Sequence, residues 1–218
     1  MIGSESLGGA KDISVKNCLF IGTDVGLRFK SLRGKGGLIE NIYVDGIRMR
    51  EITNEAILFD MYYSGGSPED EATKKRSEPK AEPVSDRTPQ FRNFEITHIL
   101  CDGASRAVLI DGLPEMPIRN IRMSDVSIKS KTGCLIQDAD SISIKNANLV
   151  FHMGPAFEVL NSTNVTLDHI VIPETTDIYM KIEGRRTMAI EALKADAGRA
   201  KKGLEVGPEV RQDAVTLK

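Results

Sequence analysis

The sequence predicts an all-β solenoid, a parallel β-helix, and three observations support this fold. Six stretches of chain share one pattern, a small polar residue followed by alternating apolar positions, and a period of two is typical of half-buried strands. The stretches recur every 21 to 29 residues, except for one step of 52. A second apolar strand follows each of the first five. Because one such unit cannot bury its apolar face alone, the repetition favours stacked units that share a continuous core.

The first strands carry the clearest alternation. They lie in KDISVKNCLF (from Lys11), ENIYVDGIRM (Glu40), RNFEITHILC (Arg92), RNIRMSDVSI (Arg119), DSISIKNANLVF (Asp140) and TNVTLDHIVI (Thr163). The second strands are GLRFK, AILFD, AVLID, CLIQD and AFEVL. We expect the inward positions of these second strands to be Leu27 and Phe29, Ile57 and Phe59, Val108 and Ile110, Leu135, and Phe157 and Val159.

Other repeat folds fit less well. Helical repeats are excluded by the many β-branched residues and by the lack of a 3.6-residue period. A leucine-rich repeat would need recurring leucines and a fixed asparagine ladder, and we expect neither. A β-sandwich, the runner-up, predicts Asn-Gly hairpin turns between the strands, and these are missing from the sequence.

The coils are expected to occupy residues 1–184, with a C-terminal cap or tail over 185–218. Residues 64–88 interrupt the repeat with mixed charges, Gly, Ser and Pro, which predicts a long surface loop. Alternatively this insert forms one wall of a cleft, because insertions in solenoids gather on one face. After Gly184 the stretch TMAIEALKADAGRAKK has helical periodicity, and the final DAVTLK predicts a strand.

Composition excludes several classes of function. The net charge of −2 argues against a nucleic-acid binder, and no segment approaches the roughly 20 apolar residues of a membrane helix. The cysteines Cys18, Cys101 and Cys134 have no metal-binding spacing, so we expect small buried side chains. The three histidines are scattered, and we expect neither a metal site nor another cofactor.

The stretch GTDVGLRFKS places two cations, Arg28 and Lys30, on one face of a strand. Side chains two apart on a strand lie roughly 7 Å from each other, and the planar fork of Arg with the point charge of Lys can straddle a carboxylate. One coil later the position of Lys30 is taken by Asp60, so the alternative is a Lys30–Asp60 ion pair with Arg28 in solvent. The adjacent Tyr62 and Tyr63 suit a sugar acid, and the residues alone predict an anionic ligand in a groove.

The block NCLFIGTDVGLRFKSLRGKGGLIENI, with AILFDMYY, IGSESLGGAKDISVKNC and GLPEMPIRNI, resembles glycoside hydrolase family 28, the polygalacturonases. This resemblance extends from Ile2 to about Asp168. It implies a right-handed parallel β-helix that acts on pectin, an α-1,4-galacturonan, by inverting hydrolysis. It also implies that Arg28 and Lys30 bind a galacturonate carboxylate, and that Tyr63 lines the same subsite.

The sequence departs from this family in its catalytic motifs. The family's Asn-Thr-Asp, paired aspartates and Gly-His-Gly are absent from the 218 residues, and we expect the catalytic residues upstream of Met1. The chain is therefore expected to be a β-helix truncated at its N-terminus, inactive alone and able to self-associate through an exposed first coil. The alternative is a non-catalytic β-helix that binds acidic polysaccharide; a pectate lyase is a weaker third. The parent family is exported, but this chain shows no signal peptide, so its compartment is not predicted.

Overall fold

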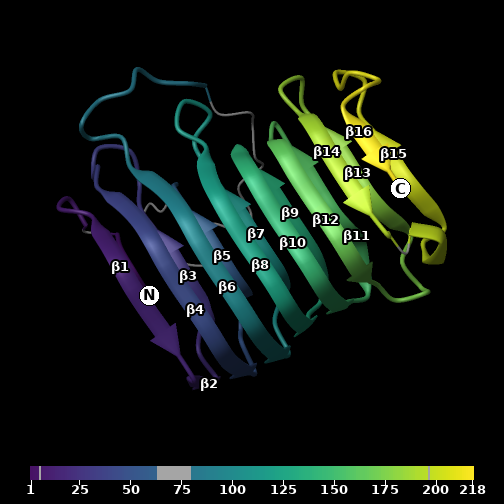
Figure 1. Ribbon diagram of the computed structural model, residues 1–218, viewed down its shortest axis with the longest axis horizontal. Helices are drawn as coiled ribbons and strands as arrows, with labels where there is room; N and C mark the ends of the chain where they lie inside the picture. The colour runs from purple at the N-terminus through teal and green to yellow at the C-terminus, as the bar shows by residue number, and fades with distance from the viewer. Residues whose placement is uncertain (5, 63–79, 196) are drawn as a thin grey trace.

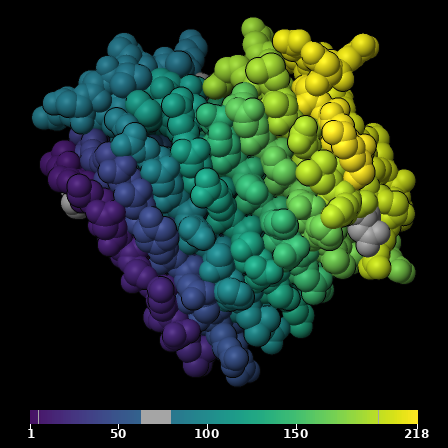
Figure 2. Space-filling model, viewed as in Figure 1, coloured from purple at the N-terminus to yellow at the C-terminus, as the bar shows by residue number. Residues whose placement is uncertain are grey.

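The computed structural model describes residues 1–4, 6–62, 80–195 and 197–218. In it the chain forms a parallel β-helix of two facing sheets, with the two termini at opposite ends of the stack (Figure 1). Each coil crosses the molecule as one band of the space-filling view (Figure 2). The predicted fold class is confirmed.

All strand pairs of both sheets are parallel. The first sheet has the order β1 (Ala10–Lys16), β4 (Leu38–Arg50), β6 (Gln90–Asp102), β8 (Ile118–Lys129), β10 (Ala139–Val150), β12 (Thr163–Val171), β14 (Met188–Leu193) and β16 (Val215–Leu217), and β2 (Leu19–Ile21) also pairs with β4. The second sheet has the order β15 (Lys202–Val206), β13 (Ile178–Glu183), β11 (Met153–Leu160), β9 (Thr132–Gln137), β7 (Arg106–Asp111), β5 (Glu55–Asp60) and β3 (Leu27–Lys30).

Each coil of the first sheet from β1 to β14 turns at two residues with positive φ, five positions apart. The pairs are Asp12 and Asn17, Asn41 and Gly46, Asn93 and His98, Asn120 and Asp125, Ser141 and Asn146, Asn164 and His169, and Ala189 and Lys194. Most are Asn, Asp or Gly, the residues that adopt this backbone conformation at least cost. The small polar residue in the sequence repeat is therefore the first of these two bends.

The first bends are joined by an asparagine ladder. Asn41 Nδ2 donates to Asp12 Oδ1 over 2.9 Å, and Asn93 Nδ2 donates to Asn41 Oδ1 over 3.1 Å. Asn120 Nδ2 then donates to Asn93 Oδ1 over 3.0 Å. The expectation that the chain has no asparagine ladder is therefore wrong. Each amide satisfies the one in the next coil, so the ladder fixes how neighbouring coils stack.

The core between the sheets is a stack of apolar side chains. Phe59 stacks on Phe29 at 4.7 Å between ring centroids, and its edge contacts Phe94 at 4.9 Å. All three are at most 3% exposed. The inward positions predicted for the second strands are buried, with one exception.

Leu135 does not point inward. In the pairing of β7 with β9, Val108 lies beside Cys134 and Leu109 lies beside Leu135. Leu135 therefore packs on the outer face, against the cluster that contains Leu109. Cys134, which is 2% exposed, takes the core position, as Cys101 does in its own coil.

The C-terminal region continues the sheets. The stretch predicted to be helical forms the strand β14 instead, and among the described residues that follow it only Ala197–Arg199 make a short 3₁₀ turn. Ile190 pairs with Val165 on one side and with Val215 on the other, so tertiary pairing overrides the local helical pattern. The strand predicted in DAVTLK is present as β16.

No helix in the described part of the chain has the length and apolar character needed to cross a membrane.

Candidate functional site

Strand β3 presents both predicted cations on the outer face of the second sheet. Leu27 and Phe29 are buried in the core, at 6% and 3% exposure, and Arg28 and Lys30 alternate with them. In the ladder Arg28 lies beside Leu58, and Lys30 lies beside Asp60. The structure thus brings the two cations together on one face, as the alternation predicted.

Arg28 is held by an acid from the preceding turn. Its Nη2 donates to Asp24 Oδ2 over 2.6 Å, and Asp24 Oδ1 in turn accepts a hydrogen bond from Asn54 Nδ2. The Arg28 side chain is 21% exposed. The alternative in which Arg28 stands free in solvent is therefore wrong. One edge of the guanidinium is fixed, which reduces the side-chain entropy lost when a ligand binds.

A partly buried carboxyl lies near this pair. Burial raises the pKa of Glu55, and the neighbouring cations Arg106 and Arg28 partly oppose that effect. Glu55 lies beside Arg106 in the ladder, at the start of its strand. A carboxyl with a raised pKa can hold a proton and donate it. Sequence analysis did not single out Glu55, because nothing in its local sequence reveals burial.

A polar row continues from Lys30 across the next coils. In the ladder Lys30 lies beside Asp60, Asp60 beside Asp111, and Asp111 beside Gln137. All four are at most 8% exposed. Sequence analysis missed Asp111 and Gln137. The stretches GLRFK, AILFD and AVLID end in Lys30, Asp60 and Asp111, so their alignment already places Asp111 in this row.

The strands that carry the two carboxylates of this row lie closer together than the two carboxyls of an inverting pair. Asp60 and Asp111 stand on adjacent strands, which lie about 4.8 Å apart. An inverting glycosidase keeps its two carboxyls about 6.5–9.5 Å apart, so that a water molecule fits between them. Asp60 Oδ1 also accepts a hydrogen bond from the backbone N–H of Tyr62 over 2.7 Å.

The end of the polar row is bordered by Tyr62 and Arg33. The Arg33 guanidinium lies over the Tyr62 ring, 5.4 Å from its centroid. Burial raises the pKa of Tyr62, so the phenol stays protonated and can donate a hydrogen bond. Tyr63, the tyrosine predicted for the site, lies outside the described residues.

Arg33 also binds Glu115 in two places, across 82 residues of sequence. Arg33 Nε donates to Oε1 over 2.6 Å, and Nη2 donates to Oε2 over 2.9 Å. Burial favours a higher pKa for Glu115, but the hydrogen bonds from Arg33 outweigh it and lower the pKa below its ordinary value. The pair attaches the loop between β7 and β8 to the loop after β3, beside the polar row.

The outer face also carries an apolar cluster next to Arg28. Leu58, Leu109 and Leu135 follow one another in the ladder, and Val25 packs with them. The polar row and this apolar cluster therefore run side by side across the second sheet. Apolar surface next to charged groups suits a sugar, whose carbon-bound hydrogens and polar groups lie on different faces.

No group of three or more potential metal ligands gathers among the described residues. His98 and His169 instead contact single aspartates, Asp45 and Asp168, at 2.8 and 2.7 Å. Nothing in the described part of the chain therefore assembles the ligands of a metal site.

The sequence profile of "Glycosyl hydrolases family 28" matches residues 1–147. Similar proteins include a "Probable polygalacturonase" of Vitis vinifera, 29% identical over 127 residues, which are 58% of this chain and 23% of that protein. "Endopolygalacturonase B" of Aspergillus niger is 30% identical over 67 residues, covering 31% of this chain and 18% of that protein. A "Polygalacturonase" of Ralstonia nicotianae is 40% identical over 67 residues, covering 29% and 12%.

The matches therefore cover about a quarter or less of the length of these relatives. No solved structure matches the chain. The profile covers more than half of the 218 residues, including β3 with both cations and the polar row as far as Gln137. The chain belongs to glycosyl hydrolases family 28.

Proposed function

We propose that this chain binds the galacturonate carboxylates of pectin through Arg28 and Lys30, as the substrate-binding part of an inverting polygalacturonase. The observation that carries the proposal is the placement of both cations on the outer face of one strand, inside the region that matches the family. Family membership supports an acidic polysaccharide as the ligand. Tyr63 is proposed to line the same subsite.

The local charges indicate how such a ligand binds. Asp24 already occupies one edge of the Arg28 guanidinium, so a carboxylate is received at the remaining donors. Lys30 lies beside Asp60 in the ladder, and these two acids offset the charge of the two cations. We therefore expect affinity to come from several sugar residues of a polymer rather than from one strongly attracted anion.

We further propose that the chain binds without cleaving. Its sequence lacks the Asn-Thr-Asp, paired-aspartate and Gly-His-Gly motifs. Asp60 and Asp111 stand on adjacent strands, whose spacing of about 4.8 Å is smaller than the separation of an inverting pair. Loss of a general acid or base slows catalysis by roughly 10²- to 10⁴-fold for each group. A non-catalytic polysaccharide-binding β-helix, the second candidate, is favoured by this same absence of motifs.

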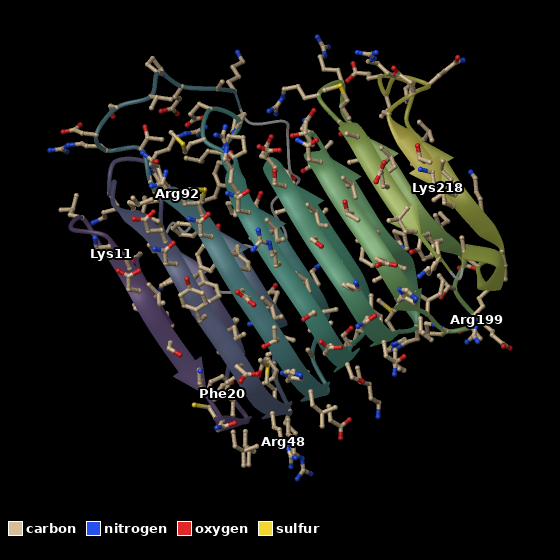
Figure 3. The ribbon with its side chains drawn as sticks, viewed as in Figure 1. Lys11, Phe20, Arg48, Arg92, Arg199 and Lys218 are labelled. Carbon is tan, nitrogen blue, oxygen red and sulfur yellow. The ribbon has the colours of Figure 1, made fainter. Side chains whose placement is uncertain are left out.

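The test mixes the protein with polygalacturonate and measures binding, new reducing ends and ultraviolet absorbance. We expect binding without new reducing ends. Arg28→Ala should weaken the affinity for galacturonate oligomers by about tenfold or more, the loss typical of a charge-assisted hydrogen bond. Arg48→Ala is the matched control, because this exposed arginine lies on the other sheet (Figure 3).

Two outcomes would contradict the proposal. An equal loss of affinity for neutral galactan in Arg28→Ala would show that the arginine does not bind the carboxylate. An unsaturated product that absorbs in the ultraviolet would indicate a lyase. New reducing ends from the purified chain would instead overturn only the proposal of binding without cleavage. Sequencing upstream of the codon for Met1 separates the two candidates, since an in-frame segment that encodes the missing motifs favours the hydrolase.

A further inference from the structure

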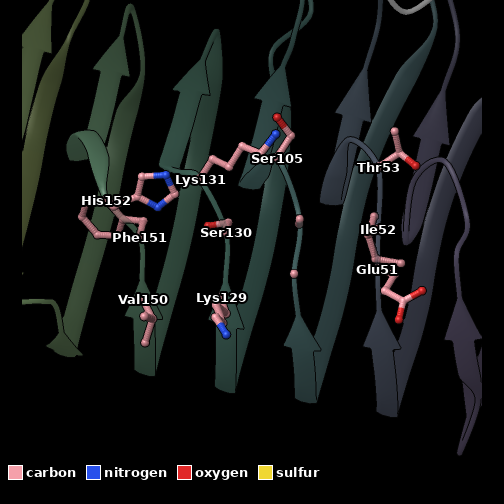
Figure 4. A pocket seen from close by; sticks show the side chains of 12 residues that line it. Glu51, Ile52, Thr53, Ser105, Lys129, Ser130, Lys131, Val150, Phe151 and His152 are labelled. Carbon is pink, nitrogen blue, oxygen red and sulfur yellow. The ribbon is translucent and has the colours of Figure 1, made fainter.

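A groove lies where the first sheet ends and the second begins, on the turns of four successive coils (Figure 4). The turns 51–53, 103–105, 130–131 and 151–152 stack on one another through backbone hydrogen bonds, such as Ile52 N–H to Gly103 O over 2.9 Å and Lys131 N–H to Ala104 O over 3.0 Å. The groove is an open depression with a volume of about 590 Å³.

Small residues in one coil create the hollow. The turn that contributes Gly103, Ala104 and Ser105 lies between coils that carry longer side chains. A Cβ added at Gly103 would meet only one heavy atom within 4 Å, a backbone nitrogen at 3.8 Å. This coil therefore forms a recess between its neighbours, and the recess is not filled by packing.

The basic groups without a partner among the described residues lie at one end of the groove. Lys131 and His152 come from adjacent coils, where the His152 N–H bonds to the Lys131 carbonyl over 3.3 Å. Neither side chain has an ion pair or hydrogen bond within the described ranges, whereas Lys129 contacts Asp102 at 3.4 Å. In Figure 4 the Lys131 side chain extends toward Ser105. An ammonium group, an imidazole and a hydroxyl thus border the recess.

The other surfaces of the groove suit the body of a sugar. Val150, which is 45% exposed, contributes apolar surface on which the carbon-bound hydrogens of a pyranose can lie, above the buried Ile52, Ala104 and Phe151. Thr53 contributes a hydroxyl and Glu51 a carboxylate at the far end. The apolar surface, the hydroxyls and the unpaired ammonium group of Lys131 suit a sugar whose carboxylate lies at the Lys131 end, because the Glu51 carboxylate at the other end would repel it.

The groove also lies close to the network that holds Arg28. Thr53 lines the groove, and the next residue is Asn54, whose side chain bonds Asp24, the partner of Arg28. Lys131 belongs to the third coil after that of Arg28, about 14 Å along the axis at 4.8 Å for each coil. One oligosaccharide that runs along the coils can therefore contact both places.

We propose that this groove is a second binding site for acidic sugar residues, in which Lys131 binds the carboxylate and His152 and Ser105 bind neighbouring oxygens. The inference rests on the proposed function for its choice of polymer. It assigns a separate role to residues other than the pair Arg28 and Lys30.

Titration of the full chain with a galacturonate trimer tests this site. Lys131→Ala should lower the affinity about tenfold, the typical effect of losing a charge-assisted hydrogen bond, and His152→Ala should lower it by a smaller factor. Lys11→Ala is the matched control, because this exposed lysine lies at the start of β1, at the other end of the strands (Figure 3). Thermal unfolding of each variant verifies that it folds.

The outcomes separate this inference from the proposed function. If Lys131→Ala binds the trimer as Lys11→Ala does, while Arg28→Ala binds weakly, the groove is not a sugar site and the proposed function stands. If Lys131→Ala binds weakly and Arg28→Ala normally, the groove stands and the role of Arg28 falls. Equal losses for a neutral galactose trimer would overturn the carboxylate role of Lys131. Titration with monomeric galacturonate, followed by the amide resonance of Lys131, should show the same site occupied at higher concentration.

Discussion

Replacing Arg33 with alanine should lower the free energy of unfolding by about 3 kcal/mol, because it leaves the Glu115 carboxylate buried without its cation. The Glu115 side chain is 5% exposed and accepts two hydrogen bonds from Arg33, at 2.6 and 2.9 Å. Breaking a buried pair from one side costs about 3–5 kcal/mol. We take the lower end because Arg33 is 25% exposed, so water can enter the space that it leaves.

Urea unfolding followed by circular dichroism measures this loss, and a double-mutant cycle identifies its source. Glu115→Ala removes the charge that Arg33→Ala leaves unpaired, so the double variant should be about 2 kcal/mol more stable than the sum of the single effects predicts. The midpoint of thermal unfolding should fall by roughly 2 °C for each kcal/mol in a chain of this length. Arg33→Lys keeps the charge but not the two-point contact, and should lie in between.

Two results would refute this reasoning. A loss below about 1 kcal/mol in Arg33→Ala would place the pair in the range of exposed ion pairs. Strict additivity in the cycle would show that the loop containing Glu115 is held by other contacts, and that the cation over Tyr62 matters independently of the acid.

Three further predictions concern the coils. Asn93→Gly keeps the left-handed backbone conformation available but removes two hydrogen bonds of the asparagine ladder. It should lower the free energy of unfolding in urea by about 1–2 kcal/mol. An unchanged midpoint would show that the ladder does not stabilise the fold. Burial raises the pKa of Cys101 to about 11 and that of Cys134 to about 12. A thiol reagent at pH 8 should therefore label only the third cysteine, Cys18, quickly. Rapid labelling of all three would contradict the burial of Cys101 and Cys134. At Asp140 burial opposes ionisation, but hydrogen bonds outweigh it and lower the pKa of the carboxyl below 3.8. The ionised carboxylate therefore stabilises the folded state above pH 3.8, and this contribution is lost as the pH falls through the folded-state pKa. The stability difference between the wild type and Asp140→Asn should therefore shrink below pH 3.8, and a constant difference would argue against it.

Much of the fold could be predicted from the sequence, because strand alternation is a direct consequence of burial on one face. Ile57 and Phe59 show the rule clearly, since each is followed by an outward residue and each is fully buried. The rule failed at Leu135, where leucine looked more apolar than the adjacent Cys134. The ladder decides such cases, because a shift of one residue turns every side chain to the other face.

The rest of the fold depended on contacts that local sequence does not reveal. Residues 188–193 have a helical pattern, yet strands on both sides of β14 offer backbone partners, and an unpaired edge there would be costly. The asparagine ladder was visible as a recurring small polar residue, but its chemistry became clear only when the coils aligned Asn41, Asn93 and Asn120.

Some residues of the candidate site could likewise be predicted from local sequence, and others could not. Arg28 and Lys30 could be placed on one face from alternation alone, because they are two residues apart. The contact between Arg33 and Glu115 joins positions 82 residues apart, and no local pattern predicts such a pair. Asp111 could be predicted in part. The repeated ends of the second strands align its position with that of Asp60, but only the strand pairing shows that the two residues lie side by side.

The direction of the two cations is therefore a property of the core beneath them. Phe29 lies between Arg28 and Lys30 in sequence and is fixed by contacts with the Phe59 and Phe94 rings, at 4.7 and 5.0 Å. A slip of one residue in β3 would expose this ring and turn both cations into the apolar core, where an unpaired charge is very costly. The packing that holds the strand in register thus also keeps both charged groups on the outer face of the sheet, with Arg28 21% exposed and Lys30 covered to all but 7%.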